Sequence, residues 1–154
     1  MEESANNALS KDEDGIEFGA LDRMLGYKLR RAQLKFFGNF SAACSDLGVS
    51  PGLFGVLVIV KENPGLTQTA VAQALGNDRS AMVAAVDKLE KMELIERRPS
   101  AKDRRSYALY LTQNGEGFCD RLIGRVIDQE EDLYSRLKEG EKEWLIDVLT
   151  RLAR

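Results

Sequence analysis

Five positively charged side chains are concentrated in nine residues of this 154-residue chain. Arg97, Arg98, Lys102, Arg104 and Arg105 lie between positions 97 and 105, with one acid, Asp103, among them. The chain as a whole carries a net charge of −3, so the cluster is not part of a generally basic surface. Local groups of guanidinium and ammonium side chains are typical of contacts with phosphates, above all those of a nucleic-acid backbone. The alternative is a charged loop tip that contacts only water.

Other kinds of chemistry have little support in the sequence. The chain has no histidine, no GxxxxGK[ST] phosphate loop and no HExxH motif, which argues against an enzyme, a metal site and a bound cofactor. Cys44 and Cys119 are far apart and read as reduced thiols. No run approaches ~20 apolar residues, and the polar N-terminus lacks the order of a signal peptide. We expect a cytoplasmic protein with no membrane span.

The spacing of apolar and turn-forming residues predicts a mainly α-helical fold with one small β-hairpin. A helical stripe begins near Glu17, and Ser50-Pro51 starts a second helix that ends near Glu62. Thr67 and then Asn77 or Asp78 each cap a further helix. Residues 94–97 and 107–111 read as paired strands with a loop of about nine residues between them. Thr112 caps a long helix that is broken at Gly140, and a last helix follows.

The order of these elements gives the basic cluster a position in a known architecture. Two short helices joined by a glycine turn form a helix-turn-helix, and a hairpin directly after it makes a winged helix. In such folds one helix enters the major groove while the hairpin lies on the backbone or the minor groove. This context favours DNA contact over a solvated loop tip. Asp103 is then expected to pair with a neighbouring arginine and fix its direction.

One segment resembles a known protein family. Residues 66–118, "LTQTAVAQALGNDRSAMVAAVDKLEKMELIERRPSAKDRRSYALYLTQNGEGF", are similar to the DNA-binding core of the MarR family of bacterial transcription factors. The matching features are the LT-opened helix, the D-x-S helix start, V-D-x-L-E-x-x-x-L-I-x-R-R, the D-R-R wing and L-T-x-x-G. The resemblance implies a dimeric winged-helix regulator, usually a repressor that a small ligand releases from DNA.

The resemblance also carries residue roles, position by position. It implies that the recognition helix is opened by Asp78, Arg79 and Ser80 and presents Ser80, Val83, Ala84 and Lys88 outward, and that Asp103, Arg104 and Arg105 form the wing tip. This chain departs from the family at Val83 and Ala84, where members often have threonine and arginine. These residues offer fewer hydrogen bonds to base edges, although both could touch thymine methyls. Arg79 is read equally well as a base or as a phosphate contact.

The chain divides into four predicted parts: a disordered lead-in over 1–16, a dimerisation and ligand-pocket helix over 17–48, a winged helix-turn-helix over 49–112, and dimerisation helices over 113–154. The apolar stripe from Leu21 to Leu29 and the one at Leu145, Val148, Leu149 and Leu152 exceed what a small winged-helix core can cover. They pack within the chain or between two copies. A homodimer would bind a pseudo-palindromic operator.

A ligand pocket is expected where the family has one, between the dimerisation helices and the DNA-binding part. Its candidate residues are Tyr27, Arg30, Arg31, Leu34, Phe37 and Phe54. The aromatic side chains could equally be core residues, and the two arginines could form ordinary ion pairs. The chain is similar to members that respond to aromatic acids or their coenzyme A thioesters, whose phosphates would need cations. A thiol-based redox sensor and a winged-helix module that binds protein instead of DNA are alternatives.

Overall fold

The computed structural model describes residues 15–102 and 105–154, which divide between Gly38 and Asn39 into a first and a second unit. The predicted lead-in over 1–16 lies outside the described residues except for its last two positions. A 3-10 helix spans Gly19–Arg23, and a second one spans Ser45–Leu47. The other elements are α1 (Leu25–Cys44), α2 (Pro51–Glu62), α3 (Gln68–Leu75), α4 (Arg79–Lys91), β1 (Ile95–Pro99), β2 (Tyr107–Leu111), α5 (Gln113–Tyr134) and α6 (Glu141–Leu152).

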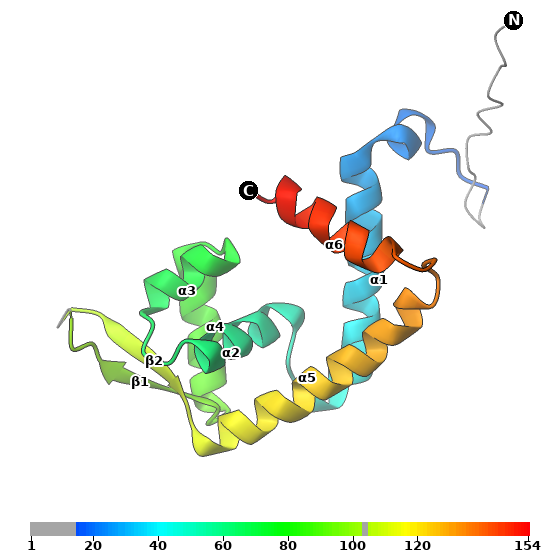
Figure 1. Ribbon diagram of the computed structural model, residues 1–154. Helices are drawn as coiled ribbons and strands as arrows, with labels where there is room; N and C mark the ends of the chain where they lie inside the picture. The colour runs from blue at the N-terminus through cyan, green and yellow to red at the C-terminus, as the bar shows by residue number, and fades with distance from the viewer. Residues whose placement is uncertain (1–14, 103–104) are drawn as a thin grey trace, which may run out of the picture. The chain divides into compact units, whose positions relative to one another are not determined.

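The second unit holds the buried core and the winged helix. Its fully buried side chains come from the end of α1, α2, α3, α4, the hairpin and α5, and they include Val56, Leu57, Val71, Met82, Val86, Leu89, Leu109 and Leu122. Within this unit the β1–β2 hairpin extends away from the start of α5 (Figure 1). The predicted class, mainly α with a two-stranded wing, is confirmed.

Side-chain caps start the helices where the sequence predicts them. Ser50 Oγ accepts from the Leu53 amide at 3.3 Å with Pro51 in the first helical turn, and Thr67 Oγ1 accepts from the Ala70 amide at 3.2 Å. These caps satisfy amides that have no partner inside their helices. Gly76 ends α3 with φ 65°, a left-handed conformation that glycine adopts without a steric penalty. The helix-turn-helix is therefore encoded locally.

The hairpin is longer than predicted. Antiparallel pairing runs from Ile95 opposite Leu111 to Pro99 opposite Tyr107, so β1 continues past Arg97 and the loop is shorter than the expected nine residues. Pro99 is accommodated at the last position of its strand, where proline does not interrupt an inner ladder. The chain before α3 extends the sheet, because Gly65 N donates to Leu109 O and Leu109 N donates to Leu66 O, each at 2.9 Å. Arg98, which was predicted in the loop, thus lies on the strand beside Arg97.

Thr112 and Gly115 join the hairpin to α5. Thr112 Oγ1 caps α5 by accepting from the Gly115 amide at 2.9 Å, and it donates to Glu93 O at 2.6 Å. A Cβ placed on Gly115 would lie 2.0 Å from the carbonyl oxygen of Leu94. The L-T-x-x-G motif therefore has a steric cause. At its other end α5 stops at Tyr134, earlier than the predicted break at Gly140, so Leu137 lies in a turn.

Two helical segments present apolar side chains to solvent. None of the residues of α6 is buried, and Trp144, Ile146 and Leu152 are more than half exposed. In the first unit, Leu21, Leu25 and Leu29 are also exposed. Within the described residues, no single helix is long and apolar enough to cross a membrane, while the consecutive segments Leu25–Leu47 and Pro51–Glu62 pass that test only together.

Candidate nucleic-acid interface

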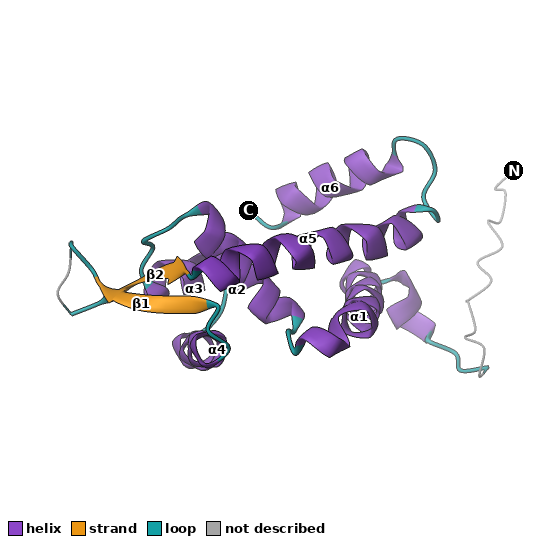
Figure 2. Cartoon of the chain, turned by 90° about the horizontal axis from the view of Figure 1, so that it is seen from below, coloured by secondary structure: helices purple, strands orange, loops and turns teal. Residues whose placement is uncertain are grey.

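Helix α4 has one buried face and one exposed face. Met82, Val86 and Leu89 are completely buried, whereas the predicted contact residues Arg79, Ser80, Val83, Ala84 and Lys88 are all exposed. Asp78 is exposed too, but its carboxylate accepts from the Ala81 amide at 2.8 Å as the helix cap. The hairpin lies beside α4, which Figure 2 shows end-on. The exposed face of α4 and the neighbouring hairpin can therefore contact the same partner.

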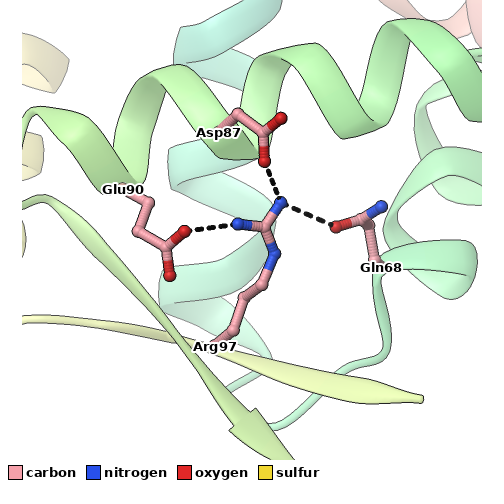
Figure 3. A network of polar contacts seen from close by, with 4 residues as sticks. All are labelled: Gln68, Asp87, Glu90 and Arg97. Atoms are coloured by element: carbon pink, nitrogen blue, oxygen red, sulfur yellow. Dashed lines mark hydrogen bonds and ion pairs between the residues drawn. The ribbon is translucent and has the colours of Figure 1, made fainter. Parts of the chain in front are cut away.

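Arg97 does not extend toward solvent as the prediction of a wing contact assumed. Its guanidinium binds Asp87 Oδ1 at 2.5 Å, binds Glu90, and donates to Gln68 Oε1 at 3.4 Å (Figure 3). Its side chain is only 17% exposed. Arg97 therefore connects β1 to α4 and α3, which favours a positioning role over direct DNA contact.

The three partners of Arg97 were not among the predicted site residues. Asp87 and Glu90 lie ten and seven positions before Arg97 in the sequence, and Gln68 lies 29 positions before it. The sequence signal for two of these partners is the acidic pair in the V-D-x-L-E motif, Asp87 and Glu90. Because Asp87 lies among the exposed residues of α4, its pairing with Arg97 reduces the negative charge that the helix would bring to DNA.

Arg98 is also held within the chain. Its Nε donates to Glu96 Oε1 at 2.8 Å, and its guanidinium carbon lies 4.1 Å from the centre of the Tyr110 ring. A cation over an aromatic face is attracted by the negative potential of the ring. The Arg98 side chain remains 55% exposed, so it can still approach a phosphate. Acids of α4 and β1 thus pair with Arg97 and Arg98.

The remaining cations are nearer the loop. Lys102 and Arg105 are exposed, and Asp103 and Arg104 lie outside the described residues. Arg79, at the start of α4, and Arg105 line the same cavity, whose volume is about 360 Å³. It is lined by Thr67, Gln68, Thr69, Ala72, Gln73, Asn77, Arg79, Met82, Arg105, Ser106 and Tyr107. Two arginines that line one cavity are suited to an anionic backbone.

The predicted ligand-pocket residues are divided between the two units. In the first unit, the Arg31 guanidinium carbon lies 5.2 Å from the centre of the Phe18 ring, and Arg31 donates to the Tyr27 hydroxyl at 3.2 Å. Arg30, Leu34 and Phe37 are exposed in the same unit. In the second unit, the half-buried Phe54 packs on the core ring of Phe40, with centroids 5.7 Å apart.

Both cysteines are fully buried in the second unit. Desolvation raises the pKa of the Cys44 thiol, against the opposing charge of Arg125, and desolvation also raises the pKa of the Cys119 thiol. A raised pKa means that less of each thiol is ionised at neutral pH than in an ordinary cysteine, and the thiolate is the form that oxidants attack. Neither residue has the environment of a redox sensor.

Comparison with known proteins agrees with this geometry. Residues 47–106 match the model of the MarR family. A protein assigned as a transcriptional regulatory protein for the hcr operon of Thauera aromatica is 40% identical over 137 residues, which cover 88% of this chain and 82% of that protein.

Two solved structures of the transcriptional repressor CouR are also similar. The structure bound to a 23-mer DNA duplex is 36% identical with a TM-score of 0.84, covering 90% of this chain and 99% of CouR. The structure bound to p-coumaroyl-CoA is 34% identical with a TM-score of 0.82, covering 90% and 98%. With this fold and these relatives, which are regulators and not enzymes, the chain belongs to the MarR family of winged-helix transcriptional regulators.

Proposed function

We propose that this regulator is a repressor that binds a pseudo-palindromic operator as a homodimer and leaves it when an aromatic acid or its coenzyme A thioester binds. The observation that carries the proposal is the exposed face of α4 beside the cations of the wing. The same fold, at 36% identity, is found in a repressor bound to a DNA duplex. Such a protein acts where bacterial DNA is, in the cytoplasm.

The DNA contact is assigned to two surfaces. The recognition surface comprises Arg79, Ser80, Val83, Ala84 and Lys88 on α4, and the wing surface comprises Arg98, Lys102 and Arg105 with the predicted Asp103 and Arg104. Phosphate contacts from the wing supply affinity without sequence preference, and the helix supplies base readout. Arg79 and Arg105, which line one cavity, suit the anionic phosphate backbone of DNA.

The homodimer is supported by apolar surface that the chain does not cover. Exposed apolar side chains would be unusually numerous if the chain were a monomer. Among them are Trp144 on α6, 63% exposed, and Leu25 on α1, 60% exposed. A two-fold axis would hold two α4 helices about 34–36 Å apart, one turn of DNA, so that each enters a major groove of one half-site. The predicted parts 17–48 and 113–154 would then serve dimerisation, and 49–112 DNA binding.

The effector assignment starts from the CouR complex with p-coumaroyl-CoA. A coenzyme A thioester combines an apolar acyl end with phosphates, so it needs aromatic walls and cations. Tyr27, Leu34 and Phe37 supply the first kind of group, and Arg30 and Arg31 the second. Among the described residues Arg30 is exposed and makes no hydrogen bond or ion pair, whereas Arg31 already lies over aromatic rings. Arg30 is therefore the better candidate for a ligand phosphate.

A gel shift tests the function and its effector together. The protein is expected to retard DNA from upstream of its own gene, and p-coumaroyl-CoA is expected to release it while free p-coumarate does not. Arg30→Ala should raise the thioester concentration needed by about tenfold, since a charge-assisted hydrogen bond is worth ~1.5 kcal/mol or more. Arg121→Ala, on α5, removes the same charge and should change nothing. Release by neither compound would contradict the effector assignment, and lack of retardation would contradict the repressor.

A further inference from the structure

The outward face of α4 has an apolar centre. Helical spacing places Ser80, Val83, Ala84 and Asp87 on the side opposite the buried residues of this helix. Val83 is 38% exposed, and Ala84 is exposed. Val83 is β-branched and therefore a poor helix former, so neither helix propensity nor core packing accounts for valine at this exposed position.

The polar side chains nearest to this apolar centre are either paired within the chain already or short. The Asp87 carboxylate pairs with Arg97, and the Asp78 carboxylate caps the helix. Ser80 offers one hydroxyl at the first turn, and Lys88 is a flexible point charge nearly one and a half turns beyond Val83. Direct reading of bases by hydrogen bonds is consequently limited along the middle of α4.

The major groove offers one apolar group on its base edges, the C5-methyl group of thymine. We propose that Val83, with Ala84 beside it, determines sequence preference by packing against thymine methyl groups in each half-site. This inference rests on the proposed DNA-binding function and assigns the chemical group that the recognition helix reads. It also gives the two residues a role that their size supports, because they are too small to form the broad apolar patch that docking of a protein requires.

The partner is therefore defined by a single methyl group, which can be removed without altering base pairing. Deoxyuridine keeps every hydrogen-bonding atom of thymidine and lacks only the C5-methyl. A loss of affinity on this exchange reports apolar contact and not hydrogen bonding. The expected loss is about fourfold for each contacted thymine, which is the fold-change for burying one CH₂-sized group, ~0.8 kcal/mol.

The experiment measures binding by fluorescence anisotropy to the upstream duplex, with each thymine replaced in turn by deoxyuridine. The unaltered protein should lose affinity about fourfold at one or two positions in each half-site. Val83→Ala should lose that sensitivity at the positions Val83 contacts, and its circular dichroism should be unchanged because alanine is the better helix former. Arg105→Ala is the matched control: it should weaken binding to every duplex equally and keep the sensitivity to deoxyuridine.

The outcomes separate the inference from the function on which it rests. Binding that is indifferent to deoxyuridine at every position would overturn the thymine readout and leave the regulator intact. The thymine readout would also be overturned if Val83→Ala, Ala84→Gly and the unaltered protein all lost the same affinity when thymine is replaced by deoxyuridine. No binding to the unsubstituted duplex would overturn the proposed function and the readout together.

Discussion

Replacing Arg97 by alanine is expected to weaken DNA binding at least tenfold although Arg97 does not point into solvent. The guanidinium pairs with two carboxylates of α4, Asp87 and Glu90, offsets one of their two negative charges and connects β1 to that helix. Without it, both acids would face the phosphates unpaired and the wing would lose an anchor. Hydrogen bonds to charged groups contribute ~1.5–3 kcal/mol each to stability. Because Asp87 and Glu90 are about half exposed, water screens these ion pairs and lowers their contribution. We therefore expect the free energy of unfolding to fall by about 2 kcal/mol.

A second substitution distinguishes this positioning role from a direct contact. Adding Asp87→Asn to Arg97→Ala removes one of the two carboxylates that lost their partner, and it should restore part of the affinity for DNA. If Arg97 instead bound a phosphate, the double variant would bind no better than the single one, and the slope of log K against log salt would fall by about 0.9. Thermal unfolding of each variant establishes that it is folded. A folded Arg97→Ala protein that binds DNA normally would contradict the role.

Replacing Gly115 by alanine is expected to lower the free energy of unfolding by about 3 kcal/mol, at the upper end for overpacked sites. The new Cβ would lie 2.0 Å from the carbonyl oxygen and 2.9 Å from the carbonyl carbon of Leu94. Both are backbone atoms of a buried residue, so no side chain can rotate away to make room. The start of α5 or the end of the wing has to move, and DNA affinity should fall as well.

A second glycine of the same helix provides the matched control. A Cβ on Gly124 would meet nothing within 4 Å in this chain. Gly124→Ala should therefore raise the free energy of unfolding by roughly 0.5–1 kcal/mol, the ordinary gain in helix propensity. Urea titration of both variants measures the two effects. Equal stability of Gly115→Ala and the unaltered protein would show that the close packing against Leu94 is not required.

The parts of the fold that could be predicted from the sequence depend on neighbouring residues. The caps at Ser50, Thr67, Asp78 and Thr112 each use a side chain and an amide three positions later, and a glycine ends α3. These signals give the helix-turn-helix and the order of the elements. They also predict which face of α4 is exposed, because the buried positions of α4 recur with helical spacing.

What the sequence did not reveal depends on contacts between distant residues. A run of cations does not show which of them is paired within the chain, so Arg97 and Arg98 were grouped with the loop although acids of α4 and β1 engage them. β1 runs past the predicted end at Arg97, and Pro99 fits at its last paired position, opposite Tyr107. The need for glycine at 115 depends on how closely α5 approaches Leu94, which no local pattern encodes.

The central claim is that α4 and the wing form one DNA-binding surface, and the salt dependence of binding tests it most directly. Anisotropy titrations of the upstream duplex over several salt concentrations should give a straight line of log K against log salt. Arg105→Ala should reduce the slope by about 0.9, the value for one lost phosphate contact, and Arg121→Ala should leave the slope unchanged. Equal slopes for Arg105→Ala and the unaltered protein, or equal losses of slope for both variants, would contradict the account.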